Sequence, residues 1–481
     1  MPDVIIIGAG PAGIFAAMTL LDRGISDILL LERGSDIEKR RCPARENNGH
    51  CLHCTPCSIL TGWGGAGAFS DGKLTLTTEV GGFLGELVPK SELEKLIRMA
   101  DQRFMDYGAP AEIYGGSTRE TRRIKALAKR AEMALVEMEV RHLGTENCYQ
   151  VLKRIRKDLE GRLEIRTETQ VKSIRVKDGT VKGVETEDGE FISAKFVVSA
   201  PGRVGADWMR GESRRLGLAA IPSPVDIGLR VELPAAVLEE LTSATYESKL
   251  IYYSKTFDDK VRTFCMNPYG EVVTEYTGDI MTVNGHSYAE KKTDNTNFAL
   301  LVSTIFTEPF DDPIAYGRYI SRLANLLGKG VIVQRLGDLL NGRRSTPDRI
   351  AHSSVRPTLE SATPGDLSFV LPYRYLKDIT EMLEAMNQIA PGVNSRHTLL
   401  YGVEVKFYSH RIEVDRNMET RIKNLFVVGD GAGITRGLIQ ASASGILAGE
   451  AISEGLSGKT KGKKSGSGRL VREYRCPLPT D

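Results

Sequence analysis

The first 32 residues constrain the fold of this chain more than any other stretch. Residues 4–7 are Val-Ile-Ile-Ile, a β-branched run without a polar member, which predicts a central strand of a parallel sheet. Gly8 allows a tight turn, Gly10 lets the backbone approach a pyrophosphate, and Gly13 lets the next helix pack on the strand. Glu32 ends a second apolar run about twenty residues further on, where a carboxylate binds ribose hydroxyls. The pattern predicts a bound dinucleotide.

The same stretch has a competing interpretation as a membrane helix or a signal sequence. Residues 4–21 contain no charged side chain, and that length suits a membrane span. Pro11 interrupts the stretch, no basic residue precedes it, and its glycines have the spacing of a nucleotide-binding turn. We therefore reject the membrane interpretation and expect no membrane span.

Length and charge narrow the function further. A chain of 481 residues predicts two or three domains. A formal net charge of +2 gives no electrostatic case for nucleic acid as a partner. Seven cysteines without a secretory signal indicate a reducing compartment, so we expect a cytoplasmic protein. Residues 458–481 carry seven Lys or Arg against two acids, which predicts a basic flexible tail.

A cysteine-rich loop follows the second strand. Cys42, Cys51, Cys54 and Cys57 have the spacing C-x8-C-x2-C-x2-C, which suits thiolates that converge on a [4Fe–4S] cluster. A four-thiolate zinc site, a redox-active Cys54/Cys57 pair and unligated thiols remain alternatives, because all of them share the C-x2-C spacing. We predict a metal centre here as one option among these.

A glycine-rich loop and two polar residues come next. Residues 62–72 contain five glycines, and the folding entropy that they lose is offset if backbone approaches a ligand closely. The loop ends at Lys73, and residues 89–160 show apolar faces at helical spacing. His142 lies between these helices, beside an Arg and a Gly turn. We assign proton delivery or anion binding to His142 and Lys73, although a lone His in such a loop is more often structural.

The rest of the chain returns to the first sheet twice. Short strands near 169–176, 181–186 and 190–194 are joined at two Asp-Gly pairs and predict a three-stranded meander. Residues 196–202 repeat a buried strand followed by glycine, and residues 420–430 form another that ends at Asp430. Residues 437–445 begin a helix of small residues, whose N-terminus would face the bound dinucleotide. Polar groups at 343–345, 352–356 and 396–397 fit either an anionic substrate or solvent.

In this order, these motifs resemble the glutathione-reductase-type FAD proteins. More narrowly, the chain is similar to an FAD-dependent dehydrogenase family marked by the loop GGAGAFSDGKL, here residues 64–74. The resemblance extends over residues 1–456 and implies FAD as the cofactor. It implies FAD contacts, including the backbone of Val171, from this set: Gly8, Gly10, Pro11, Ala12, Gly13, Glu32, Arg33, Gly64, Gly65, Ala66, Gly67, Phe69, Ser70, Val171, Ala200, Gly202, Gly429, Asp430 and Ile439.

The sequence thus predicts an α/β fold with a glutathione-reductase-type, Rossmann-like FAD domain, a three-stranded β-meander and an inserted α+β substrate domain. We expect the FAD domain over 1–205, with the cysteine loop 42–57 and a helical segment 89–160, and again over 411–457. We expect the substrate domain over 206–410.

We expect an FAD-dependent oxidoreductase that moves a hydride between flavin N5 and a small molecule, at a C–C double bond. No second nucleotide motif is present, so electrons would come from NAD(P)H, a redox protein or the iron–sulfur cluster. An FAD-dependent monooxygenase and a non-redox FAD-containing binding protein are the alternatives. The substrate, the reaction direction and the oligomeric state are not specified by the sequence.

Overall fold

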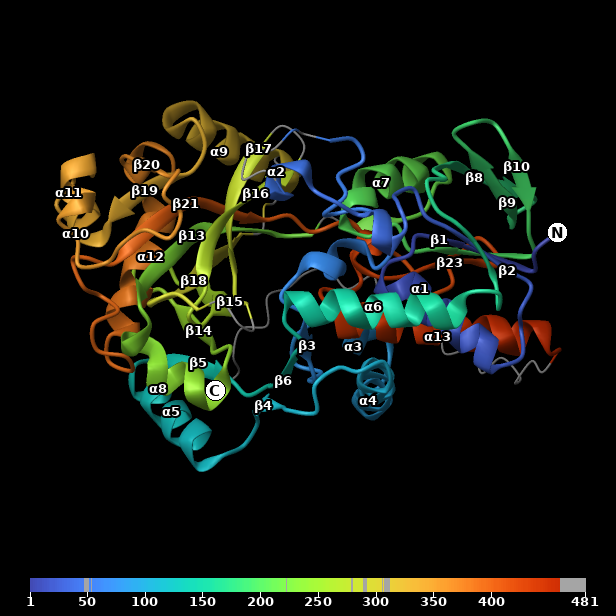
Figure 1. Ribbon diagram of the computed structural model, residues 1–481, viewed down its shortest axis with the longest axis horizontal. Helices are drawn as coiled ribbons and strands as arrows, with labels where there is room; N and C mark the ends of the chain where they lie inside the picture. Colours follow the sequence, from blue (N-terminus) through green and yellow to red (C-terminus); the bar gives the residue numbers. More distant parts are fainter. Residues whose placement is uncertain are drawn as a thin grey trace.

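The computed structural model of the protein describes residues 1–46, 52, 54–221, 223–277, 280–288, 292–304, 306 and 312–458. Two sheets, each with its own helices, lie side by side (Figure 1). The first sheet is built from both ends of the chain, and the second from the middle. Each sheet has a large apolar core of its own.

Five of the described strands form the first sheet, and all its pairings are parallel. Val4 is the register partner of both Phe196 and Ile28, so the opening strand lies at the centre. This is the position that its wholly apolar sequence predicts, because both faces are covered. In spatial order the strands are β23 (Leu425–Val427), β11 (Phe196–Ser199), β1 (Val4–Ile7), β2 (Ile28–Leu31) and β7 (Glu164–Arg166).

Two long helices, α1 (Pro11–Asp22) and α13 (Leu438–Leu456), pack against each other beside this sheet, and α4 (Lys90–Asp106) packs on α13. The two helices α1 and α13 lie so close together that a Cβ at Gly445 would be 2.1 Å from the carbonyl oxygen of Ala12. The small residues of α13 therefore bring the two N-termini of α1 and α13 to the same end of the sheet.

A three-stranded antiparallel meander packs against β11. Its strands are β8 (Val171–Lys177), β9 (Thr180–Thr186) and β10 (Phe191–Ser193). Asp178 and Gly179 both have positive φ, 52° and 67°, as a two-residue hairpin turn of the I′ type requires. The helix α7 (Ala206–Arg215) follows the return strand.

The segment predicted as helical over 89–160 is not helical throughout. Between α4 and α6 (Thr145–Leu159) the chain forms β4 (Tyr114–Gly115), α5 (Arg119–Arg130), β5 (Met133–Val136) and β6 (Glu139–His142). The strand β5 pairs with β14 of the second sheet, and β6 pairs with β3 (Lys73–Thr75) and β4. The helical periodicity of α4 and α6 gave no information about the short strands between them. In Figure 1 the β3–β6–β4 sheet lies between the two larger bodies.

Eight of the described strands form the second sheet, in the order β20-β19-β21-β13-β18-β15-β14-β5. Only the β19–β20 pairing among them is parallel. The helices α8 (Ala235–Thr245), α9 (Pro313–Gly328) and α12 (Tyr373–Met386) cover its apolar face. Its strands are β13 (Val225–Pro234), β14 (Lys249–Tyr253), β15 (Lys260–Asn267), β18 (Asn295–Thr304), β19 (Ile332–Arg335), β20 (Thr363–Pro364) and β21 (Leu399–Lys406), with β5.

Smaller elements complete the described chain, and a hairpin of β16 and β17 packs on the second sheet. No helix in the described ranges combines the length and the apolar character that a membrane crossing needs. The remaining elements are α2 (Pro43–Glu46), α3 (Leu84–Leu87), β12 (Ala220–Ile221), β16 (Glu271–Thr277), β17 (Ile280–His286), α10 (Leu336–Leu340), α11 (Pro347–Ala351) and β22 (Arg411–Ile412).

Candidate functional site

In the opening turn, Gly8 and Gly13 are tightly packed against backbone, whereas Gly10 faces the space in which the sequence predicts a ligand. A Cβ at Gly8 would lie 2.2 Å from the carbonyl oxygen of Ala200, and a Cβ at Gly13 would lie 2.0 Å from that of Gly8. A Cβ at Gly10 would meet no heavy atom within 4 Å. Helix α1 starts at Pro11 and has no side-chain cap, so its first N–H groups face this open space. The turn fits an anion at the helix N-terminus.

Glu32 is buried and connects three backbone segments. Its Oε2 accepts a hydrogen bond from the N–H of Ala9 at 2.9 Å, and its Oε1 accepts from Gly34 and Gly62 at 2.8 and 3.0 Å. The carboxylate therefore holds the opening turn, the end of β2 and the start of the glycine-rich loop together. With one bond on Oε2, this oxygen retains an acceptor lone pair for a ribose hydroxyl.

The glycine-rich loop lies between the N-termini of α1 and α13. Residues Gly65–Phe69 form a short 3₁₀ helix, and the N–H of Gly64 donates to the carbonyl of Ala9 at 2.7 Å. A Cβ at Gly65 would lie 3.2 Å from the Cα of Gly10, and one at Gly67 would lie 2.6 Å from Leu438 of α13. The loop backbone therefore approaches the backbone of the opening turn and a side chain of α13, which explains the density of glycine.

A buried arginine, which the sequence interpretation did not single out, holds this loop in place. Arg40 donates to the carbonyls of Trp63 and Gly65, and its guanidinium carbon lies 4.9 Å from the ring centroid of Phe69. Burial lowers the pKa of Arg40 to about 10, and the nearby Glu32 carboxylate opposes that shift. The run of charges before the cysteine loop contained this residue, but sequence alone does not tell a buried arginine from a solvated one.

The second return strand brings Asp430 to the same end of the sheet. A Cβ at Gly429 would lie 3.0 Å from the Cβ of Ala12, so this turn rests on α1. Asp430 accepts hydrogen bonds from Thr435 at 2.8 Å and from Arg203 at 3.1 Å. Helix α13 begins after Gly437 without a side-chain cap, and a Cβ at Gly437 would meet nothing within 4 Å.

These observations test whether the residues fit FAD. Two uncapped helix N-termini, an open turn, a buried carboxylate and a second carboxylate converge on one end of the parallel sheet, where ligands of such sheets bind. The donor set suits a dinucleotide with a pyrophosphate and two polyol segments. The other predicted contacts also lie on these segments: Gly202 after β11, Ser70 and the exposed Ala66 in the loop, Arg33 bonded to Thr61, Ile439 in the first turn of α13, and Val171 at the start of β8.

The two predicted catalytic residues, Lys73 and His142, are direct register partners on β3 and β6. Lys73 is only 8% exposed, and its ammonium nitrogen lies 3.0 Å from Asp71 and 3.2 Å from Glu247. It also donates to the carbonyl oxygen of Met266 on β15 at 2.7 Å. Lys73 therefore joins the glycine-rich loop of the FAD domain to the second sheet.

His142 lies against the residues that end helix α8. The hydroxyl oxygen of Tyr246 lies 3.1 Å from a ring nitrogen of His142 and 3.1 Å from the hydroxyl of Ser287. Tyr246 has a φ of 53°, and Cys265, next to the carbonyl that Lys73 contacts, has a φ of 45°. Non-glycine residues with positive φ are uncommon and concentrate at functional sites.

Charge and burial give Lys73 and His142 different protonation states. Burial opposes the charge on Lys73, but the carboxylates of Asp71 and Glu247 outweigh it and raise the pKa of Lys73 well above its usual value. Burial lowers the pKa of His142, with Asp71 opposing. Burial raises the pKa of Tyr246 to about 12. At pH 7 the site therefore holds a charged lysine, a neutral histidine and a neutral phenol.

The face of the second sheet that turns away from its apolar core is charged. Arg230 of β13 and Glu404 of β21 are both fully buried, and they pair at 2.7 and 2.8 Å. Arg230 also donates to Asn297 and to the carbonyl of Cys265. The sequence interpretation missed this network, although the alternation of apolar and polar residues over 225–232 signalled one polar face.

The cysteine loop falls partly outside the described residues. Cys51 lies outside them, whereas Cys42 and Cys57 are partly exposed and Cys54 is exposed. Within the described ranges, no group of three or more His, Cys, Asp or Glu side chains gathers in a way that could hold a metal ion. The predicted metal centre therefore stays a prediction.

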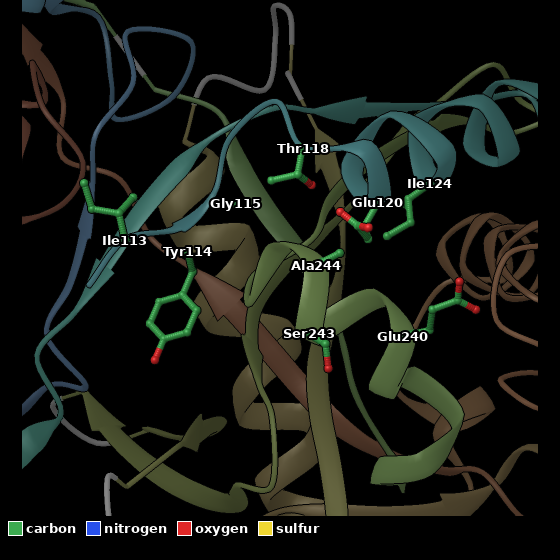
Figure 2. Close-up of a pocket in the computed structure, with 9 residues that line it drawn as sticks. All are labelled: Ile113, Tyr114, Gly115, Thr118, Glu120, Ile124, Glu240, Ser243 and Ala244. Atoms are coloured by element: carbon green, nitrogen blue, oxygen red, sulfur yellow. The ribbon is translucent and has the colours of Figure 1, made fainter.

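The polar groups near 343–345 and 396–397 are occupied by local partners. Arg343 bonds to Asp338 at 2.9 Å, and Arg396 donates to His397 at 3.2 Å. They give no sign of a substrate site. A cavity of about 460 Å³ lies elsewhere, between α5 and α8, where Figure 2 shows Glu120 and Ser243 on facing helices. Tyr114 lines it and stacks on Tyr246 with ring centroids 5.0 Å apart, so the cavity adjoins the His142 cluster.

Comparisons with known proteins find two family matches on this chain. Residues 1–215 match a family described as "FAD binding domain", and residues 224–407 match one described as "FAD-dependent protein, C-terminal domain-like". A Clostridium beijerinckii protein, described as an uncharacterized protein, is 30% identical over 479 residues, which cover 94% of this chain and 80% of that protein. The chain belongs to the same family of FAD-dependent proteins.

Solved structures show more distant likenesses. The glycerol-3-phosphate dehydrogenase from Bacillus halodurans, complexed with FAD, is 12% identical with a TM-score of 0.41, and the match covers 95% of this chain and 65% of that chain. The glycine oxidase from Bacillus cereus is 12% identical with a TM-score of 0.38, and 96% of each chain is covered. This chain thus spans less than two thirds of the length of the dehydrogenase.

Proposed function

We propose that this protein is an FAD-dependent oxidoreductase of the dehydrogenase or reductase type, with a small-molecule substrate that gains or loses hydrogen at a C–C double bond. We also propose that its cofactor domain is of the glutathione-reductase type. The observation that carries the proposal is the partly buried Lys73–His142–Tyr246 cluster, located where the FAD domain meets the second domain. When bound, FAD supplies a two-electron hydride acceptor or donor.

The residues of this chain have separate roles in the proposal. The N-termini of α1 and α13, Glu32 and Asp430 would hold the cofactor. Lys73 is held in its charged form by Asp71 and Glu247, so it provides a fixed positive charge rather than a base. Burial lowers the pKa of His142, so it is neutral at pH 7 and can accept the proton that a substrate C–H loses in dehydrogenation. In the reverse direction, olefin reduction, the same residue would return that proton.

The test uses the full-length protein loaded with FAD. The flavin is photoreduced without oxygen and mixed with fumarate, cinnamate or cyclohexenone, and the return of its visible absorbance is followed. We expect at least one olefin to reoxidise the protein faster than buffer. His142→Gln should slow that step by about 10²–10⁴-fold while the flavin stays bound. His397→Gln is the matched control, because His397 lies outside the cluster and pairs with Arg396.

The same protein, assayed also with NADPH in the presence of oxygen, separates the alternatives. If no olefin exceeds the buffer rate, the proposed C–C chemistry is wrong. If NADPH oxidation consumes one O₂ per turnover and a product gains oxygen, the protein is a monooxygenase. If flavin reduction has no effect on any activity, the cofactor has a non-redox role.

The source of electrons is a separate part of the proposal. The candidate electron donors are NADH or NADPH, a redox protein, and a [4Fe–4S] cluster on Cys42, Cys51, Cys54 and Cys57. Anaerobic purification with iron and sulfide analysis tests the cluster. Iron-free protein after reconstitution would remove it from the mechanism.

A further inference from the structure

Arg436 occupies an unusual place beside the predicted flavin site. It directly precedes Gly437, where α13 begins, and its N–H donates to the carbonyl of Gly81 at 2.7 Å. The N–H of Gly437 lies 3.4 Å from Asp430. Arg436 thus lies on the segment that connects one predicted cofactor ligand to the N-terminus of α13.

The guanidinium of Arg436 is stacked rather than paired. Its central carbon lies 3.5 Å from the ring centroid of Tyr408 and 5.1 Å from that of Phe83. Its Nη2 nitrogen is buried and has no hydrogen-bond partner among the residues that the structure describes. Stacking uses the face of the guanidinium and leaves the N–H donors at its edge free. A buried donor without a partner is costly, and bonding to a ligand would satisfy it.

A second cation, Lys249, lies on β14, which pairs with β15, and Arg262 of β15 donates to the hydroxyl of Tyr408, on which Arg436 stacks. Lys249 of β14 is half-buried. Its pKa is lowered to about 7, mainly by burial and also by the cations Arg262, Lys260 and Arg436, with Glu247 opposing. The region around Lys249 is therefore electropositive.

The acids of this region are already engaged. Asp226 pairs with Arg262 and accepts from the Tyr408 hydroxyl at 2.5 Å and from Ser303 at 2.7 Å. Glu247 pairs with Lys73 at 3.2 Å. Within the described ranges, Arg436 and Lys249 have no carboxylate of their own in ion-pair contact, so an anion from outside the protein would complete the site.

We infer that Arg436 and Lys249 bind a carboxylate of the substrate, so that the substrate is an organic acid. The inference rests on the proposed function and names the substrate class of the same site. A carboxylate suits the site because the edge of a guanidinium donates two parallel N–H bonds to its two oxygens. The stacked ring of Tyr408 holds the guanidinium plane in one orientation, which favours this planar partner.

The test measures anion binding without turnover. Isothermal titration calorimetry on the FAD-loaded protein uses benzoate, fumarate, inorganic phosphate and the neutral benzamide. We expect at least one carboxylate to bind at least tenfold more tightly than both benzamide and phosphate. Arg436→Met should weaken that carboxylate at least tenfold, and Arg436→Lys should restore part of the affinity. Arg411→Met is the matched control: Arg411 also stacks on Phe83 but pairs with Glu86, so affinity should stay within twofold.

Lys249 provides a second readout. A bound carboxylate raises the pKa of Lys249, so binding at pH 7 takes up as much as about half a proton per site. Titrations in two buffers of different ionisation enthalpy measure this uptake, and Lys249→Met should abolish it while the protein stays folded.

Three results would overturn the inference. The first is that wild type and Arg436→Met bind carboxylates with equal affinity. The second is that phosphate binds more tightly than every carboxylate. The third is that Arg436→Met loses FAD while its thermal stability is unchanged. The last result would assign Arg436 to the cofactor. Carboxylate binding without any olefin reduction would contradict the proposed function alone, so the two failures are distinguishable.

Discussion

Two glycines of the opening turn provide a sharp test, because the structure predicts that the same substitution lowers stability at one of them and FAD affinity at the other. In Gly13→Ala, the new methyl group would lie 2.0 Å from the carbonyl oxygen of Gly8 and 3.2 Å from Ile6. In Gly10→Ala, it would meet no protein atom within 4 Å. The first substitution should damage the fold, and the second should damage only the binding of FAD.

The magnitudes follow from these distances. Overpacking costs about 1–3 kcal/mol, and the upper end applies to Gly13 because the colliding atom is backbone. The helix preference of alanine offsets about 1 kcal/mol, so Gly13→Ala should lower the free energy of unfolding by roughly 2 kcal/mol. Gly10 has φ −80° and ψ 179°, which alanine adopts readily, so its substitution should change stability by less than about 1 kcal/mol. A methyl group against the pyrophosphate should weaken FAD at least about 100-fold, or 2.7 kcal/mol.

The assay has two parts. Urea denaturation of the FAD-free proteins gives stability, and tryptophan fluorescence follows it because Trp63 is buried within the glycine-rich loop. Flavin fluorescence titration gives FAD affinity. Wild-type FAD affinity in Gly10→Ala would refute the placement of the pyrophosphate at this turn. Unchanged stability in Gly13→Ala would refute the close packing of α1 on β1.

Three further predictions concern buried charges. Glu404→Gln leaves Arg230 charged and fully buried, so urea denaturation should show a loss of about 3–5 kcal/mol, and a loss under 1 kcal/mol would contradict this. Burial opposes ionisation of Asp338, but hydrogen bonds from two arginines and a serine lower its pKa to about 2, below its ordinary 3.8. Its ionised form therefore stabilises the protein above pH 3.8 and loses that effect as the pH falls through 2, so Asp338→Asn should destabilise at pH 7 and have little effect near pH 2. The pKa of Lys249 falls from 10.5 to about 7 on folding, so between pH 7 and pH 10.5 the unfolded chain binds more protons than the folded chain. The wild-type protein therefore becomes more stable as the pH rises through this range. Lys249→Met should increase the free energy of unfolding at pH 7, and this gain should shrink as the pH rises to 10.5. An equal gain at both pH values would show that Lys249 is solvated.

The sequence identified the parts of the site that local pattern encodes. The strand of residues 4–7, its glycines and Glu32 lie within one βαβ unit, where neighbours along the chain are neighbours in space. The meander followed from Asp-Gly turns of the same local kind. Asp430 could be placed because the end of a buried parallel strand has only one edge to reach.

Only the tertiary structure decided what surrounds Lys73 and His142. Their register across β3 and β6, the approach of Tyr246 and Glu247, and the crossing of β5 into the second sheet join segments about 70 to 190 residues apart. The same holds for Arg230 with Glu404, and for Arg436 stacked on Tyr408. Periodicity tells which face of a strand is polar, but it does not tell which distant segment covers that face. The sequence alone therefore determined the cofactor turn, whereas packing between the two domains determined the charge state of the residues beside it.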